Sequence, residues 1–383
     1  MIQKPLPNRV ITVEQGLEEI RRGRMVILVD DEDRENEGDL CCAADRVTPG
    51  IINFMATHGR GLICLTLSEE KAETLDLKPM VKENESPFGT AFTSSIDAAS
   101  GISTGISAQD RAHTILEAVR EDSKPEDFAR PGHIFPLIAR NGGVLVRPGQ
   151  TEGSVDLARL AGLPPAGVIC EIMREDGTMA RMPDLNEFGE VHDINIVTVA
   201  SLIQYRMARE KLISKKSQIS DLPRLEGNIR VATYISPLTP DDVYIALIKG
   251  EMSPEDAVLV RIHRECFLGD LFGSQLCDCS QKLQRAREMI TAEGKGVLLY
   301  IRRKDFSSET HQKSPFCGAS DPLLERKGRS GESMFRREVL NCGVCAKILS
   351  DLGIRRVRSI TSNPDNQTTF KTYGIELVDM VGL

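Results

Sequence analysis

The chain has 383 residues, too many for one ordinary hydrophobic core, so we expect two domains. Its 40% hydrophobic and 27% charged residues are typical of a globular protein, and the net charge of −8 argues against a general nucleic-acid-binding protein. The sequence has no apolar stretch long enough to span a membrane and no signal-peptide pattern, which predicts a cytoplasmic protein that binds neither membranes nor nucleic acid.

Helical and strand-like segments alternate through the first half of the chain. Helices are predicted at 12–20, where Thr12 is a candidate N-cap with Gln15 three residues later, and at 110–119, 154–160 and 199–208. Apolar runs predict strands at 25–29, 61–67, 142–146 and 167–172. This alternation, with glycines at the turns, indicates an α/β (α+β) fold.

A polar, basic stretch at 209–217 is the best candidate for a linker, and it divides the chain into predicted domains 1–206 and 207–383. The second domain contains predicted strands at 228–235, 259–263, 296–301 and 357–361 and helices at 283–292 and 346–352. Each domain is therefore expected to be a mixed sheet with packed helices. Residues 303–341 differ because they are rich in Ser, Lys, Arg and Gly and have almost no hydrophobic period, which is unusual inside a compact domain.

The run DDEDRENEGD, residues 30–39, places seven carboxylates and one arginine directly after an apolar segment. Such a run is most often a solvated loop. Because this one follows a predicted buried strand, it is also a favourable place for a divalent cation and a polyol, since Mg²⁺ takes oxygen ligands and an arginine suits a phosphate. The candidate residues of the run are Arg34, Glu35 and Asp39.

Three further candidates lie in the first half of the chain. His133, in RPGHIFPL, is either a structural histidine or a proton shuttle. The turn at 147–152, RPGQTE, precedes a helix, and backbone amides with a nearby arginine suit a phosphate. Glu171 lies in the apolar run VICEI, where a carboxylate is costly unless it is paired or functional.

Cysteines supply the candidate site of the second half. Of the ten cysteines, Cys266, Cys277 and Cys279 cluster in the sequence, with His263 and Glu265 beside them. Three thiolates with a fourth position open are typical of a catalytic zinc site. Buried small hydrophobes are the simplest explanation for most of the other cysteines.

Taken together, these motifs resemble two families of riboflavin biosynthesis. DDEDRENEGD, RPGHIFPL and PAGVICEIMREDGTMARMPDL are similar to 3,4-dihydroxy-2-butanone-4-phosphate synthase, and the resemblance covers residues 8–205. VRIHRECFLGDLFGSQLCDC, EGKGVLLYIRR, AKILSDLGIRRVRSITSNP and YGIEL are similar to GTP cyclohydrolase II. The order of the two is that of the fused riboflavin-biosynthesis family.

For the first domain, the resemblance implies conversion of ribulose 5-phosphate to 3,4-dihydroxy-2-butanone 4-phosphate and formate, with Mg²⁺ or Mn²⁺ as the cofactor. It implies that Glu35 binds the metal and that His133 and Glu171 are the catalytic proton-transfer residues. It also implies a homodimer with sites at the subunit interface. Substrate binding is implied for Arg34, Glu35, Asp39, Arg147, Pro148, Gly149, Gln150, Thr151 and Glu171.

One position of the first domain departs from the family pattern. The family has a histidine, its second protein ligand to Mg²⁺, in the string Arg-x-Gly-His-Thr-Glu, and this chain has Gln150 there. The amide oxygen of glutamine is an acceptable ligand for a hard cation, but the side chain has a different reach and cannot transfer protons. Weakened metal binding is therefore expected.

For the second domain, the resemblance implies a zinc ion on Cys266, Cys277 and Cys279, and GTP contacts from Arg261, His263, Glu265 and Thr361. This domain departs further from its family. The family's Gln-Glu-Gly-Arg-Gly is replaced at 303–307, its catalytic Asp-x-Arg at 338–340, a glutamine by Lys282 and a lysine by Asn366, and the chain ends soon after the last matching strand. Loss of GTP cyclohydrolase II activity is expected, and a compensated pair of frameshifts is our hypothesis for 303–341.

Three interpretations follow for the whole chain. The favoured one is a dihydroxybutanone phosphate synthase with a degenerate second domain. A bifunctional enzyme that also opens GTP to the diaminopyrimidine is the second, and the missing arginine argues against it. The third is a non-catalytic paralogue that serves as a scaffold or partner of an active homologue, and Gln150 is its main support.

Overall fold

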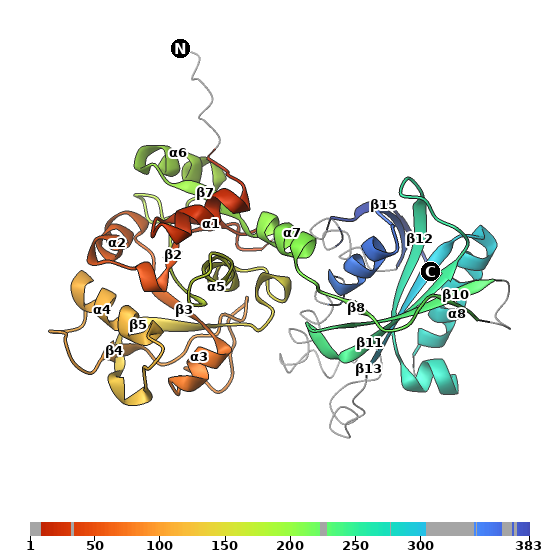
Figure 1. The fold of residues 1–383 in the computed structure, drawn as a ribbon, viewed down its shortest axis with the longest axis horizontal. Helices are drawn as coiled ribbons and strands as arrows, with labels where there is room; N and C mark the ends of the chain where they lie inside the picture. The colour runs from red at the N-terminus through yellow and green to blue at the C-terminus, as the bar shows by residue number, and fades with distance from the viewer. Residues whose placement is uncertain are drawn as a thin grey trace, which may run out of the picture. The chain divides into compact units, whose positions relative to one another are not determined.

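A computed structural model describes residues 9–31, 34–222, 228–275, 277–303, 341, 343–361, 370 and 374–383 (Figure 1). The chain divides into two compact units, Met1–Tyr205 and Arg206–Leu383, each with its own mixed sheet. The predicted two-domain α/β fold with packed helices is confirmed. None of the helices in the described ranges is long and apolar enough to cross a membrane.

The first domain is built on a seven-stranded sheet with the order β4-β5-β3-β6-β2-β1-β7. Its pairings are mixed, because β1 runs parallel to β7 and antiparallel to β2, while β3 runs parallel to β5 and antiparallel to β6. The strands are β1 (Val26–Val29), β2 (Gly38–Ala43), β3 (Cys64–Ser68), β4 (Ile96–Ala98), β5 (Phe128–Ala139), β6 (Ala166–Glu171) and β7 (Asn195–Thr198).

Helices cover both faces of this sheet. The helices are α1 (Val13–Arg21), α2 (Pro49–Phe54), α3 (Glu69–Thr74), α4 (Ala108–Val119), α5 (Gln150–Leu160), α6 (Met182–His192) and α7 (Val199–Arg209). On one face α5 packs against β1, where Gly153 lets the helix approach Leu28. On the other face the main buried cluster joins strand residues such as Ile27 and Leu40 to α2, α4 and α6. Burying side chains of this size stabilises by about 1.5–3 kcal/mol each.

The second domain has an eight-stranded mixed sheet. Its main path has the order β15-β14-β12-β13-β11-β10-β8, and β9 pairs with β10. The helix α8 (Cys279–Glu293) contributes Ala286 and Ile290 to a buried cluster with Leu259 and Leu298. The strands are β8 (Ser214–Lys215), β9 (Ser220–Leu222), β10 (Ile229–Ser236), β11 (Thr239–Lys249), β12 (Ala257–Arg264), β13 (Gly296–Arg303), β14 (Arg356–Ile360) and β15 (Glu376–Val381).

The structure differs from the predicted elements in three places. Residues 143–145 form a 3-10 turn instead of a strand, because Gly142 and Gly143 adopt positive φ angles of 94° and 61°. Helix α5 begins at Gln150 instead of 154, so part of the predicted binding turn is the first helical turn. Within the expected linker, Ser214 and Lys215 form a short strand that pairs with β10.

Candidate functional site

The acidic run forms a loop that is organised by its first carboxylate, Asp30. This side chain has no exposed surface and accepts hydrogen bonds from the Arg34 guanidinium at 2.6 Å and from the backbone N–H groups of Glu35 at 3.2 Å and Glu37 at 2.9 Å. Arg181, at the start of α6, holds the loop from the other side through the carbonyl oxygens of Glu35, at 2.7 Å, and Asn36. The described part of the run is therefore an ordered loop and not a freely solvated one.

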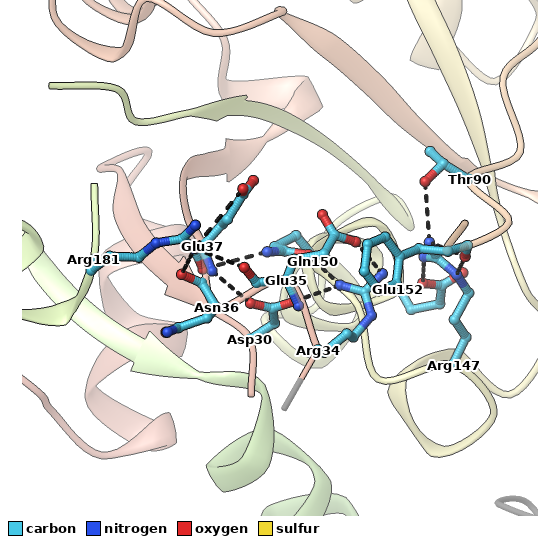
Figure 2. Close-up of polar contacts among 11 residues, drawn as sticks. Asp30, Arg34, Glu35, Asn36, Glu37, Thr90, Arg147, Gln150, Glu152 and Arg181 are labelled. Carbon is cyan, nitrogen blue, oxygen red and sulfur yellow. Dashed lines mark hydrogen bonds and ion pairs between the residues drawn. The ribbon is translucent and has the colours of Figure 1, made fainter. Parts of the chain in front are cut away.

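Gln150 connects this loop to α5 (Figure 2). Its Oε1 accepts a hydrogen bond from Arg34 Nη1 at 2.9 Å, and its Nε2 donates to the carbonyl oxygen of Glu37 at 3.4 Å. The side chain is buried, so both ends of the amide are used in holding the loop. Arg34 also contacts the Glu35 carboxylate at 2.6 Å and lies over the ring of Phe88.

Two guanidinium groups meet at Gly149, the N-cap of α5. A Cβ at Gly149 would lie 2.7 Å from Arg147 Nη1 and 3.0 Å from Arg34 Nη2. Arg147 is held by a buried ion pair with Glu152 at 2.6 Å and by the carbonyl oxygen of Phe88 and the hydroxyl of Thr90 (Figure 2). A helix N-terminus flanked by two arginines is suited to bind a phosphate.

Asp39 and Glu171 face each other across the β2–β6 pair. The register pairs Asp39 with Glu171 on one side and with Leu28 on the other, so both carboxylates share the sheet face that α5 covers. Glu171 Oε2 accepts the backbone N–H of Leu62 at 2.8 Å, and the absence of a side chain at Gly61 makes room for the carboxylate. The two acidic groups therefore lie at the same end of the sheet as the start of α5.

The pKa values of three carboxylates in this cluster, those of Glu35, Glu37 and Asp39, are raised. Burial raises the pKa of Glu35 against the opposing effect of Arg34, and burial together with the charge of Glu35 raises the pKa of Glu37. Burial, followed by the charge of Glu171, raises the pKa of Asp39 well above its ordinary value. A bound divalent cation would stabilise the charged forms of all these groups.

The oxygen donors of the cluster fit a hard cation such as Mg²⁺. Among the described residues, no three carboxylates of this cluster have oxygen atoms that all lie within 4.8 Å of one another. Mg²⁺ is commonly held by one or two carboxylates, with waters and substrate oxygens as the remaining ligands, so Glu35 with a second oxygen donor is sufficient.

His133 is oriented by a carboxylate that the sequence analysis did not single out. Asp97, on β4, accepts the backbone N–H of His133 at 2.9 Å and lies 2.7 Å from its Nδ1. Because the carboxylate is the acceptor, Nδ1 carries the proton and Nε2 is left as the basic nitrogen. Gly105 packs directly against this pair, since a Cβ there would lie 2.2 Å from Asp97 Oδ2.

Asp97 could have been found from the sequence. It lies in the buried strand Ile96–Ala98, and like Glu171 it is a carboxylate among apolar neighbours, which is costly unless it is paired or functional.

The structure does not bring His133 into contact with Glu171 within one chain. His133 lies on β5 and Glu171 on β6, and β3 separates the two strands. Two interstrand spacings amount to about 9.5 Å. Arg34, Glu35 and Gln150 are in contact, Asp39 and Glu171 are neighbours, and Arg147, Pro148, Gly149 and Thr151 lie around the start of α5.

The second domain gathers its three candidate cysteines. The Sγ atoms of Cys266, Cys277 and Cys279 all lie within 4.8 Å of one another, and the Cys266–Cys277 distance is 3.7 Å. The Gly269 backbone N–H donates to Cys266 Sγ at 3.3 Å, and a Cβ at Gly269 would lie 3.0 Å from both Cys266 and Cys277 Sγ. A cluster of three thiolates fits Zn²⁺ with one position open.

The candidate GTP-binding residues lie around this cluster. Arg261 and His263 alternate along β12 and so share one face, and Glu265 follows the end of the strand. Arg261 Nη1 donates to the carbonyl oxygen of Ile360 at 2.9 Å. His263 is buried against Asp270, and Thr361 directly follows β14. Lys282 forms an ion pair with Asp278 at 2.8 Å. The predicted degenerate segment 303–341 lies outside the described residues except for the backbone of 303 and for 341, and Asn366 lies outside them.

Comparison with known proteins agrees with this arrangement. The chain matches the family 3,4-dihydroxy-2-butanone 4-phosphate synthase over residues 14–205 and the family GTP cyclohydrolase II over residues 215–382. It is 49% identical to the riboflavin biosynthesis protein RibBA of Aquifex aeolicus (strain VF5), covering 97% of this chain and 91% of that protein.

Two solved structures are similar. One is RibBX from A. baumannii, described as a two-domain 3,4-dihydroxy-2-butanone 4-phosphate synthase, with 39% identity, a TM-score of 0.67, and coverage of 97% of this chain and 99% of that one. The other is a 3,4-dihydroxy-2-butanone 4-phosphate synthase in complex with two magnesium ions, with 38% identity, a TM-score of 0.51, and coverage of 52% and 98%.

A domain of the synthase type followed by one of the cyclohydrolase type defines a class of two-domain proteins. The chain belongs to the fused riboflavin-biosynthesis family, in which a 3,4-dihydroxy-2-butanone 4-phosphate synthase domain precedes a GTP cyclohydrolase II domain. The predicted resemblance is confirmed.

Proposed function

We propose that the first domain converts D-ribulose 5-phosphate to 3,4-dihydroxy-2-butanone 4-phosphate and formate. The observation that carries the proposal is the meeting of Arg34 and Arg147 at Gly149, beside the carboxylates of Glu35, Asp39 and Glu171. The four-carbon product and formate together contain the same atoms as the five-carbon substrate. The reaction is therefore balanced without an oxidant or a reductant.

The arginines and the N-terminus of α5 would bind the substrate phosphate. Both guanidinium groups are held by carboxylates, Arg34 by Asp30 and Arg147 by Glu152, so the pocket is ordered before the substrate arrives. The N–H groups in the first turn of α5, at Gln150 and Thr151, add donors in the same place. The sugar hydroxyls would then lie toward Asp39 and Glu171.

Mg²⁺ or Mn²⁺ on Glu35, with Gln150 Oε1 as the second candidate oxygen, would supply Lewis-acid stabilisation of the negative charge that develops on the substrate oxygens. Magnesium is bound in the similar synthase structure. In this chain the carbonyl oxygen of Gln150 already accepts a hydrogen bond from Arg34, which supports the expected weaker metal binding.

His133 and Glu171 are the proposed proton-transfer residues. Asp97 fixes the His133 tautomer so that Nε2 is free to accept a proton from carbon or oxygen of the substrate. Glu171 keeps Oε1 available while Oε2 accepts the Leu62 N–H. Enolisation and the later proton return need a base and an acid, and these two groups supply both.

The proposal is tested by measuring formate released from ribulose 5-phosphate by the full chain, with and without Mg²⁺. We expect metal-dependent release that falls by about a hundredfold or more in Glu35→Gln and is unchanged in the control Glu70→Gln on the exposed side of α3. A folded wild-type protein that releases no formate at any Mg²⁺ concentration would favour the scaffold interpretation.

A homodimer remains part of the proposal. Three apolar side chains near the site are exposed, those of Leu62, Phe88 and Ile106. The ring of Phe88 contacts Arg34, and the other two are close in sequence to residues of the site. Such exposed apolar side chains are consistent with a second copy of the chain covering the site. If His133 of one chain serves Glu35 of the other, mixing inactive Glu35→Gln and His133→Ala proteins under exchange restores activity, because one site of each mixed dimer is intact. Mixtures that stay inactive despite proven exchange would place both residues in one chain's site.

For the second domain, the sequence departures at 303–307 and 338–340 are the reason to propose that GTP is not opened. The match to GTP cyclohydrolase II over residues 215–382 gives no support to that loss, and the gathered cysteines favour retained zinc binding. Release of formate from GTP by the zinc-loaded chain distinguishes the two: the proposal expects none, and turnover would make the chain bifunctional.

A further inference from the structure

Asp270 is the centre of a buried hydrogen-bond network in the second domain. It lies in the short π-helix η5 (Phe267–Leu271), directly after Cys266. Its Oδ2 accepts from the Tyr300 hydroxyl at 2.9 Å, from His263 Nε2 at 3.0 Å and from the Cys266 backbone N–H at 2.9 Å. The side chains of His263 and Asp270 are 3% and 7% exposed, so donors from β12, β13 and the cysteine loop converge on one carboxylate away from solvent.

Asp270 holds Cys266 on both sides of its Cα atom. The carboxylate accepts the Cys266 N–H, and the Asp270 backbone N–H donates to the Cys266 carbonyl oxygen at 2.6 Å. With both peptide groups fixed, rotation about the Cα–Cβ bond is the remaining freedom of the thiol. The Gly269 N–H restrains that rotation through its 3.3 Å contact with Cys266 Sγ.

The other two cysteines come from a separate segment at the start of α8. Cys277 and Cys279 meet Cys266 with all three Sγ atoms within 4.8 Å, so the geometry of the cluster depends on where Cys266 is held. Groups that orient a ligand in this way typically change metal affinity by about 10- to 100-fold when they are removed.

We propose that Asp270 is the positioning residue of a zinc site formed by Cys266, Cys277 and Cys279, and that it acts through the backbone of Cys266. His263 and the Cys266 N–H are sufficient to hold the carboxylate, and the Tyr300 hydroxyl is an additional donor. The zinc site is then a built feature of this domain that does not require turnover of GTP, and it is separate from the proposed ribulose 5-phosphate chemistry of the first domain.

A purely structural role for this network would have a different signature. A buried carboxylate with several donors stabilises the fold whether or not zinc is bound. Removing it would then lower the melting temperature of the zinc-free and zinc-loaded protein equally. A positioning role instead lowers the zinc affinity and reduces the increase in melting temperature that zinc produces.

The test uses the full chain and zinc competition against a chromophoric chelator, together with thermal melts with and without zinc. Cys277→Ser removes one ligand of the cluster, and the zinc that this variant still binds serves as the background from other sites. For Asp270→Asn we expect an affinity about 10- to 100-fold lower and a smaller zinc-induced rise in melting temperature. Wild-type affinity in Asp270→Asn with a lower melting temperature of the zinc-free protein would overturn the proposal.

Tyr300→Phe is the matched variant, and it tests the proposal even if Asp270→Asn does not fold. It removes one hydrogen bond to Asp270 and leaves the carboxylate on Cys266. We expect its zinc affinity to stay within about threefold of wild type. A tenfold loss in folded Tyr300→Phe would mean that the effect does not run through Cys266 and would also overturn the proposal.

Discussion

Gln150 occupies the position of the family's metal-binding histidine, and its side chain is hydrogen-bonded to an arginine. Its amide holds Arg34 through Oε1 and the Glu37 carbonyl through Nε2, so the loop is tied to α5 by protein contacts alone. A metal ion at the same oxygen must compete with a hydrogen bond from a charged group, which is worth roughly 1.5–3 kcal/mol. We therefore expect the departure from the family histidine to affect metal binding first.

Gln150→His should strengthen metal binding, because it supplies a ring nitrogen and frees the position from Arg34. We expect the concentration of Mn²⁺ that gives half-maximal formate release to fall by about tenfold. The control is Gln284→His on the exposed side of α8. An unchanged metal requirement in Gln150→His would show that this position does not contact the metal.

Asp39 is held at a cost in stability. Burial, followed by the charge of Glu171, raises the pKa of Asp39 well above its ordinary 3.8. Above pH 3.8 the unfolded chain therefore loses this proton more readily than the folded protein, which lowers the free energy of unfolding. Asp39→Asn should increase the free energy of unfolding at pH 8 in chelator by roughly 1–3 kcal/mol, with the gain shrinking toward pH 4, while formate release is lost. Urea titrations at the two pH values measure it, and a destabilised Asp39→Asn at pH 8 would contradict the account.

Gly149→Ala tests the phosphate pocket. The N-cap φ of −120° suits alanine, so the cost is the space that Arg147 and Arg34 occupy. We expect a KM for ribulose 5-phosphate about tenfold higher or more, with a normal melting temperature. Gly50→Ala, whose nearest side-chain atom is 3.6 Å away, is the control, and an unchanged KM in Gly149→Ala would exclude this pocket.

Residue types and motifs made several of these positions predictable. The acidic run and Glu171 stood out as carboxylates next to or within apolar segments. The sequence does not show which carboxylate of the run is buried and bonded to the loop backbone. In the structure this is Asp30, whereas Glu35 forms an ion pair with Arg34. That division depends on hydrogen bonds to backbone groups that come together only when the loop has folded.

At the scale of elements, α6 links two parts of the site. Its first residues follow Arg181, which holds the acidic loop, and its last residue, His192, packs on His58 with ring centroids 4.7 Å apart. His58 lies in the π-helix Met55–Gly59, and the chain continues from there to Leu62, which donates to Glu171. Phe54 and Phe188 complete this aromatic cluster.

The cluster predicts a loss of stability in mild acid. Burial, then the neighbouring His58, lowers the pKa of His192 from its ordinary 6.5, so the unfolded chain takes up the proton first as pH falls. Stability is full above pH 6.5 and declines as the pH drops toward the lower folded-state value. His192→Phe should flatten this decline in urea titrations between pH 7.5 and 5.5. His113→Phe is the control and should keep the wild-type decline. If the free energy of unfolding of His192→Phe falls with pH as steeply as that of wild type, the prediction is wrong.

Element boundaries were predictable where a periodic pattern carried its own cap. Helix α1 begins at Val13, directly after the expected N-cap Thr12, and the reciprocal capping box with Gln15 is present. The start of α5 could not be predicted because its N-cap, Gly149, has no side chain to signal a cap. The 3-10 turn at 143–145 was predicted as a strand because a short apolar run has the same pattern in a strand and in a turn fixed by glycines.

At the scale of the whole molecule, the proposed synthase chemistry draws on residues of the unit Met1–Tyr205 alone, and the three gathered cysteines belong to the unit Arg206–Leu383. Because each unit has its own sheet, we expect sequence change in one domain to leave the fold of the other unchanged. The alternation of elements made this organisation predictable.

The most direct measurement follows ribulose 5-phosphate labelled with ¹³C at C4, the carbon that the family resemblance implies is released as formate, through the reaction with the full chain and Mg²⁺. We predict that the label appears in formate, in equal amount to the four-carbon product, and that Glu35→Gln lowers both by about a hundredfold or more. Label that stays in the sugar phosphate, or that appears in formate equally with Glu35→Gln, would contradict the claim that the loop of residues 30–39 and the start of α5 form the active site.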